Sequence, residues 1–362
     1  MAVKQGLAAL ELPYLVKEAS ALVGARLDGI RQLSESEFSF SFYVRNLGTM
    51  RLVVSLPSYV FLAAGKGEGE WRVSGFCSRL KSILLNARLT AIQQLGNERI
   101  LELTFSKSET FSLFVELFSK GNLLLCDKDR LILSALRTLV FKDRSLKAGE
   151  RYALPPPINN PFGMEKQEFF QGLKSSGKES VVKALALDFG LGGKYAEECC
   201  LAASVDKGKK PADVSAEEAE RVFSAVQGLV GRPPAPEVVR DGVVDAVPFP
   251  LLLYATVARQ PASSFSEAIA QVLKSSQPPV GDARTGKLQR IISEQEAKIS
   301  ELREGAELDR RRGELMYENY ALVQGILEAA SQAWKENRLA AFRHPGVKSV
   351  SAKDGKITVE LE

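Results

Sequence analysis

Hydrophobic and polar residues alternate along several short segments in the first third of the chain. In 38–44, three phenylalanines alternate with serine or tyrosine, and in 99–105 two leucines and a phenylalanine alternate with glutamate and threonine. Because successive side chains of a strand point to opposite faces, this period of two predicts strands with one buried face. Further strands are expected at 51–56, 111–118, 122–126 and 131–136.

Two segments of the same region have helical spacing. The sequence predicts an amphipathic helix over 12–23 and a second helix over 75–85. A mixture of helices and antiparallel strands indicates an α+β domain. The prolines at 155–157 and the sequence Asn159-Asn160-Pro161 favour extended backbone, so we expect this first domain to cover residues 1–157.

The next region is expected to form a mainly helical domain over residues 158–275. It is interrupted at Lys207-Gly-Lys-Lys-Pro211 and contains one short strand-like segment at 243–250. A linker with two prolines, 276–281, then separates it from the rest of the chain.

The segment 284–343 is expected to form a long coiled-coil arm. Between 287 and 343 there is no proline, and apolar residues recur at alternating spacings of three and four, which is typical of a coiled-coil seam. At 1.5 Å per residue this helix would extend roughly 85 Å. Its apolar stripe needs a partner, either a second copy of the arm or a returning helix of a longer protein, because 344–362 predicts only one short strand pair.

Composition limits the kinds of function that the chain can have. It has 362 residues, a formal net charge of +4, four cysteines and one histidine, His344. A site with several histidine ligands, a Ser-His-Asp triad and a Cys-x-x-Cys zinc site are therefore not expected. No apolar run approaches the ~20 residues that a membrane span needs. We expect a cytoplasmic protein without metal, cofactor, catalytic residue or membrane partner, and the mild positive charge permits nucleic-acid binding.

Glu98 and Arg99 form the first candidate site. They lie between the Gly96-Asn97 turn and the body of a predicted strand. Neighbouring strand residues point to opposite faces, so the two do not make a simple salt bridge. Two interpretations are open: two solvated residues at a strand end, or a carboxylate and a guanidinium that bind a polar ligand such as RNA.

A glycine-rich turn between two predicted helices forms the second candidate. Gly192 and Gly193 would let a nucleic-acid backbone approach closely, and the next helix would present its first amides, together with Lys194, to a phosphate. A turn selected for tight helix packing is the alternative interpretation.

Three consecutive arginines on the expected arm, Arg310, Arg311 and Arg312, form the third candidate. Glu307, Asp309 and Glu314 surround them. They form either a solvated charged face or a surface that follows the phosphates of a nucleic acid.

Several of these segments, taken in order, resemble the NFACT family. The resemblance rests on 10–12 with 24–32, on 98–100, 116–122, 149–157 and 190–198, and on Val247-Pro-Phe-Pro-Leu251 before the arm. It implies an NFACT-N domain similar to the N-domain of formamidopyrimidine-DNA glycosylases, then a helix-hairpin-helix domain, the first coiled-coil arm, and the start of a middle domain at 344–362.

The resemblance also implies a role in ribosome-associated quality control. Members bind the large ribosomal subunit and its rRNA while the subunit holds a stalled nascent chain on peptidyl-tRNA. They recruit tRNA, and several support C-terminal tailing without mRNA; the chemistry is the ribosome's own, so the chain would not be an enzyme. A family Asp-Arg pair associated with tRNA contact corresponds to Glu98 and Arg99, and a further family aspartate corresponds to Glu11, so these three residues are implied to bind tRNA.

Two other classes of function remain as alternatives. One is a nucleic-acid-binding protein related to DNA glycosylases but without their activity, because the chain begins Met1-Ala2-Val3 and lacks their amino-terminal Pro-Glu. The other is a surface fibronectin-binding adhesin, which predicts export, and the first residues contain no export signal.

Overall fold

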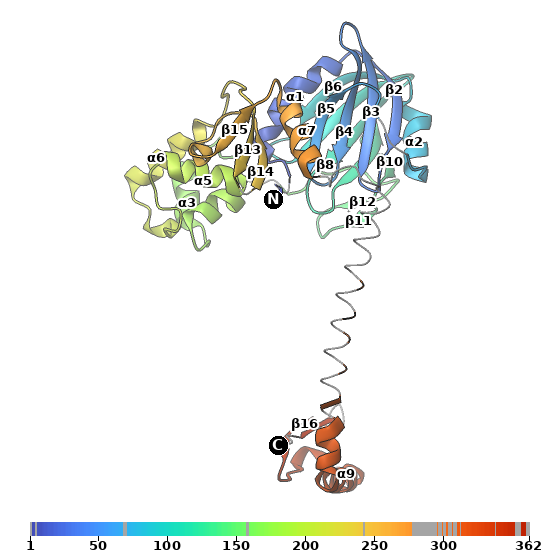
Figure 1. Cartoon of the computed structure of the whole chain (residues 1–362), viewed down its shortest axis with the longest axis vertical. Helices are drawn as coiled ribbons and strands as arrows, with labels where there is room; N and C mark the ends of the chain where they lie inside the picture. Colours follow the sequence, from blue (N-terminus) through green and yellow to red (C-terminus); the bar gives the residue numbers. More distant parts are fainter. Residues whose placement is uncertain are drawn as a thin grey trace. The chain divides into compact units, whose positions relative to one another are not determined.

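The computed structural model describes most of the chain. In the first part it covers residues 2–3, 6–67, 71–156, 159–241 and 243–276, and in the second 313–336, 338–351 and 356–359, with single helical positions at 295, 299, 302, 306, 310 and 311. The chain divides into two compact units, Met1–Gln277 and Pro278–Glu362 (Figure 1).

A nine-stranded antiparallel sheet forms the centre of the first unit, in the order β10-β9-β8-β7-β6-β2-β3-β4-β5. The strands are β2 (Arg26–Gln32), β3 (Glu37–Val44), β4 (Gly48–Ser55), β5 (Tyr59–Ala64), β6 (Arg88–Gln94), β7 (Ile100–Ser106), β8 (Thr110–Glu116), β9 (Asn122–Asp127) and β10 (Ile132–Ala135). Phe38, Phe40 and Phe42 are fully buried, as their alternation predicts. The expected mixed α+β class is confirmed, whereas the likeness to glycosylases stays a prediction.

Three helices pack on this sheet: α1 (Leu12–Ala19), α2 (Gly75–Leu84) and α7 (Phe265–Ser276). The helix predicted over 12–23 is present, but its last part is the tighter 3-10 turn η2 (Ser20–Leu22). Helix α7 comes from much later in the chain and packs against β5, and its apolar side chains join the core of the sheet. The Glu18 carboxylate of α1 accepts hydrogen bonds from the first amides of α7, at 2.6 Å from Phe265 and 3.0 Å from Ser266.

A buried ion pair lies beneath the small hairpin of β11 (Leu139–Val140) and β12 (Ser145–Leu146). The Arg144 guanidinium donates to both carboxylate oxygens of Glu116, at 2.6 and 3.2 Å, and the Tyr152 hydroxyl donates to the same carboxylate at 3.1 Å. Burial and the negative charge of Glu116 raise the pKa of Tyr152 far above its usual value near 10. The phenol therefore stays protonated and remains a donor.

The region after residue 158 is built mainly of short helices around a core of its own. The elements are α3 (Lys166–Ser175), α4 (Val181–Lys183), the π-helix η3 (Ala184–Asp188), α5 (Gly192–Ala202), η4 (Pro211–Asp213), α6 (Ala216–Gln227) and η5 (Leu252–Tyr254). Helices α4 and α5 are joined through η3 by a glycine-containing turn. Assignment of this element to the helix-hairpin-helix class stays a prediction.

A second, four-stranded sheet lies between the two cores, in the order β1-β14-β13-β15. Its strands are β1 (Ala2–Val3), β13 (Glu237–Asp241), β14 (Val243–Val247) and β15 (Ala258–Pro261). Val244 and Ala246 face the core of the large sheet, while Val247 faces the helical core. The sequence suggested only the strand near 243–250, and this sheet joins the two halves into one unit.

In the second unit, helix α9 (Tyr320–Lys335) is followed by η6 (Leu339–Ala341) and by a hairpin of β16 (Val347–Ser351) and β17 (Lys356–Val359). The two strands are antiparallel, as expected for 344–362. The helix expected to reach residue 343 ends at Lys335 instead, and the short turn η6 that follows contacts α9. Most of 284–312 lies outside the described residues, so coiled-coil pairing of the arm stays a prediction.

Candidate nucleic-acid interface

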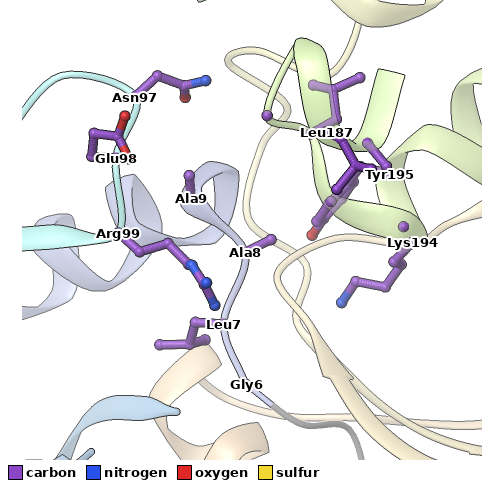
Figure 2. Close-up of a pocket in the computed structure, with 15 residues that line it drawn as sticks. Gly6, Leu7, Ala8, Ala9, Asn97, Glu98, Arg99, Leu187, Lys194 and Tyr195 are labelled. Carbon is purple, nitrogen blue, oxygen red and sulfur yellow. The ribbon is translucent and has the colours of Figure 1, made fainter. Parts of the chain in front are cut away.

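A pocket of about 520 Å³ lies between the large sheet and the helical half of the first unit. Three separate segments line it: Gly6–Ala9 before α1, Asn97–Arg99 before β7, and part of 186–195 around the turn into α5 (Figure 2). Two candidate sites predicted independently from the sequence, the Glu98–Arg99 couple and the glycine turn, therefore line one pocket.

Arg99 is held by backbone pairing at the start of β7. Its carbonyl accepts a hydrogen bond of 2.8 Å from the amide of Leu117, and its side chain extends toward Leu7, while Glu98 lies on the other side of the backbone (Figure 2). Burial lowers the pKa of the Arg99 guanidinium, and the nearby Glu98 carboxylate partly offsets this effect. No ion-pair partner of Arg99 within 4.0 Å is found in the described part of the chain, so a half-buried cation faces the pocket.

The glycine turn presents exposed backbone to the same pocket. Gly192 has a φ of +75°, a conformation that side chains disfavour, and a Cβ added to Gly193 would meet no atom within 4 Å. Helix α5 has no side-chain cap at its N-terminus and no acidic residue in its first turn. The first amides of a helix lack intrahelical acceptors and attract anions. The open space at Gly193 favours the close-approach interpretation over tight packing at that position.

Lys194 lines the pocket, but its side chain is only 10% exposed and its ammonium is paired internally. Its ammonium lies 2.5 Å from the Glu11 carboxylate and 3.1 Å from that of Asp245. Glu11 is completely buried and also accepts hydrogen bonds from the Ala8 amide, at 2.7 Å, and from the Tyr195 hydroxyl, at 3.0 Å. Both charged groups are enclosed and paired in this arrangement, and the expected contact of Glu11 with tRNA and of Lys194 with a nucleic-acid backbone stays a prediction.

Glu11, Lys194 and Asp245 form a buried cluster that we call the interdomain latch. Two tyrosines donate hydrogen bonds to its carboxylates. The Tyr254 hydroxyl donates to Asp245 at 3.1 Å. Burial, followed by the charge of the nearby carboxylates, raises the pKa of Tyr195 and Tyr254 well above the usual range. The phenols therefore stay protonated donors. Because the latch links the segment before α1, helix α5 and strand β14, it fixes the two walls of the pocket relative to each other.

Two further pocket residues were not identified from the sequence. The side-chain nitrogen of Asn97 is buried and has no hydrogen-bond partner in the structure as described, and Leu187 on the π-helix η3 is 60% exposed. π-Helical turns occur frequently at functional sites. The Gly96-Asn97 turn was visible in the sequence. The local pattern could not show that the Asn97 amide would lie near a segment roughly ninety residues away, because such proximity depends on closing a long loop and not on local conformational preference.

The arginine triplet lies in the second unit and is exposed where described. Arg310 is 3.8 Å from Glu314, one helical turn away. Arg312 lies outside the described residues. Contact of Arg310, Arg311 and Arg312 with the ribosome stays a prediction.

These observations define an α+β protein with an interdomain pocket suited to a polar, anionic ligand. The chain belongs to the NFACT family, since residues 10–342 match the family of NFACT N-terminal and middle domains. The family expected from the sequence is thereby confirmed.

Named relatives agree with this assignment. The chain is 28% identical over 345 residues to the archaeal Rqc2 homolog aRqcH of Methanocaldococcus jannaschii, an alignment that covers 88% of this chain and 51% of that protein. It is 31% identical over 160 residues to ribosome quality control complex subunit 2 of Schizosaccharomyces pombe, covering 42% of this chain and 16% of that protein. The chain thus spans about half the length of the archaeal relative.

The fold is shared with the N-terminal part of the fibronectin/fibrinogen-binding protein of Streptococcus suis. That structure has a TM-score of 0.59 and 22% identity, with coverage of 75% of this chain and 100% of the other. A fibrinogen-binding protein of Staphylococcus aureus has the same TM-score at 18% identity, covering 72% of this chain and 97% of that one. At these identities the likeness concerns the fold alone.

The described residues were also searched for two other kinds of site. They include no group of three or more histidine, cysteine, aspartate or glutamate side chains that could hold a metal ion. No helix among them has the length and apolar character needed to cross a membrane.

Proposed function

We propose that this chain acts in ribosome-associated quality control. In this role it binds the large ribosomal subunit that holds a stalled peptidyl-tRNA, recruits tRNA, and supports tailing of the nascent chain without mRNA. The family assignment supports the general role, because its relatives include proteins named ribosome quality control complex subunit 2. Binding of the subunit, its rRNA and tRNA is our proposal.

The pocket between the halves is the observation that carries this proposal. A half-buried guanidinium, a buried amide donor and uncapped helix amides surround one cavity, and each is a donor suited to RNA. Arginine can fork onto a phosphate or stack on a base, while the helix amides favour phosphate oxygens. The exposed Leu187 adds an apolar surface against which a base can pack. We infer that the chain binds and orients tRNA and supplies no catalytic group, leaving peptide-bond chemistry to the ribosome.

Substitution of Arg99 tests the pocket directly. Arg99→Ala should lower tRNA affinity by about 1.5–3 kcal/mol, the usual value of a charge-assisted contact, which is roughly ten- to a hundredfold. Glu98→Ala should also weaken binding, and Arg99→Lys should be impaired because an ammonium cannot fork or stack. Arg45→Ala, which removes an exposed arginine at the turn between β3 and β4, is the matched control. Unchanged tRNA affinity in folded Arg99→Ala protein would refute the pocket as the tRNA site.

Co-sedimentation tests the wider role. The full-length protein should bind free large subunits that carry peptidyl-tRNA and should not bind intact ribosomes. Equal binding to both, or to neither, would count against the proposal. Retention on fibronectin without any ribosome binding would favour the adhesin alternative.

A further inference from the structure

The outer face of helix α2 is basic and contains no acidic residue. The helix buries Cys77, Leu80 and Leu84 against the sheet and exposes Arg79 and Lys81. Neither cation has an ion-pair partner within 4.0 Å among the residues that the structure describes. Most exposed cations of the helical half, in contrast, are paired, for example Lys183 with Glu179 and Lys207 with Glu197.

More positive charge gathers at the C-terminal end of α2. The Lys107 ammonium donates to the carbonyl of Ile83 in the last turn, at 3.4 Å. Arg88, which begins β6 just after this helix, lies directly opposite Arg26 of β2. Like charges at directly opposed positions of a sheet destabilise it, and of the two arginines Arg26 is neutralised, by Asp28 at 3.1 Å. Arg88 therefore adds its positive charge to this end of α2.

An exposed aromatic side chain lies at the other end of the same helix. The Arg31 guanidinium stacks over the ring of Trp71, 3.9 Å from its centroid, and Trp71 is 49% exposed. Arg72 follows and pairs with Glu35 at 3.2 Å, a contact exposed on both sides. An arginine stacked on a tryptophan supplies both the charge and the flat apolar surface that nucleic acids contact.

The surface is separate from the pocket. Arg79, Lys81, Arg88 and Lys107 are not among the residues that line the pocket between the two halves. Figure 1 shows α2 on the side of the large sheet away from the helical half that forms one wall of the pocket. Arg79 and Lys81 are two residues apart and therefore project from different sides of α2, so each would contact a different phosphate of a backbone.

We propose that the α2 surface, defined as Trp71, Arg79, Lys81, Arg88 and Lys107, binds the sugar-phosphate backbone of double-stranded RNA. Backbone binding needs separated cations on an outward face and no base-reading groups, and this is what the surface offers. The choice of RNA among polyanions rests on the proposed function. The surface is a second contact, independent of Arg99, that would hold a structured RNA while the pocket engages tRNA.

Salt-dependent binding of a blunt RNA duplex of random sequence tests the proposal, because the duplex has no loop or end that resembles tRNA. Arg79→Ala/Lys81→Ala should weaken duplex binding and reduce the slope of log K against log salt by about two, one for each lost phosphate contact. Arg79→Glu/Lys81→Glu should weaken it further. The matched control is Lys183→Ala/Lys207→Ala, which removes the same charge from the helical half.

The outcomes separate this proposal from the pocket. Arg99→Ala should leave duplex binding unchanged while it lowers tRNA affinity, so failure of the pocket would not affect the duplex result. The α2 proposal is overturned if wild-type protein does not bind the duplex, or if Arg79→Ala/Lys81→Ala binds with the wild-type slope. It is also overturned if the control loses as much affinity, since net charge would then suffice. Displacement of the duplex by poly-glutamate at equal charge concentration would indicate an acidic protein partner and would likewise refute RNA specificity.

Discussion

Removing the cation of the interdomain latch should destabilise the first unit strongly. Lys194→Met keeps a side chain of similar length but leaves the carboxylates of Glu11 and Asp245 without their shared ammonium. Their side chains are 0% and 4% exposed, and the lysine is 10% exposed. Breaking a buried ion pair by removing one partner typically costs about 3–5 kcal/mol. Because a domain is stable by only about 5–15 kcal/mol, this is a large share of the total.

Urea-induced unfolding of the chain measures this loss, with near-UV circular dichroism as the signal. Lys183→Met is the control: it removes an exposed lysine from an i,i+4 pair, and such pairs contribute about 0.3–0.5 kcal/mol. Glu11→Gln/Lys194→Met should be more stable than Lys194→Met alone, since the amide oxygen can still accept from Ala8 and one unpaired charge is gone. A Lys194→Met protein within about 0.5 kcal/mol of wild type would show that the latch does not join the halves.

Three other expectations follow from the first unit. Arg144→Met should cost about 3–5 kcal/mol in urea unfolding, because Glu116 remains buried without its cation; wild-type stability would contradict the buried pair. Gly193→Val should leave the melting temperature nearly unchanged but lower tRNA affinity in a binding titration, and the reverse result would favour the packing interpretation. Lys209 and the Ser215 backbone amide lower the pKa of Glu218, so its stabilising effect is present above the unfolded value near 4.3 and is lost as pH falls through the folded value. Glu218→Gln should therefore melt earlier than wild type at pH 7, with a difference that vanishes in acid, and a constant difference would refute this origin.

Local pattern predicted most strands of the large sheet, because an alternation such as that of β3 indicates a buried face. Strands β5 and β6 were not predicted, and most residues of β8 and β9 are buried on both faces. The alternation of Phe38, Phe40 and Phe42 is a direct result of that burial. The small sheet escaped prediction for the opposite reason. Its valines face two different cores, so β13 and β14 have no simple alternation of apolar and polar positions. Its strand β1 pairs with β14 from the far end of the unit, a contact that no local window contains.

The sequence identified several residues of the candidate site but not the contacts that they make with one another. Arg99 and the glycine turn were selected from local chemistry, and both line the pocket. Glu11, implied by the family resemblance, and Lys194, chosen with the glycine turn, form buried ion pairs that the sequence did not predict, and their contact with nucleic acid stays a prediction. Their partner in each case is more than a hundred residues away. Long-range pairing of buried charges leaves no periodic signal in the sequence. Glycine-containing turns, in contrast, can be recognised from a few neighbouring residues.

The late position of α7 has a consequence for how the protein is made. Residues 1–157 contain every strand of the large sheet, yet Phe265, Ile269 and Val272 of α7 belong to the same core. Synthesis proceeds from the N-terminus, and domains generally fold as units once they are complete. During translation the face of β5 must therefore stay uncovered while the whole helical half is synthesised. If synthesis stopped in that interval, the core residues of the large sheet that α7 covers would remain exposed. They are covered only after synthesis has reached residue 276, the last residue of α7.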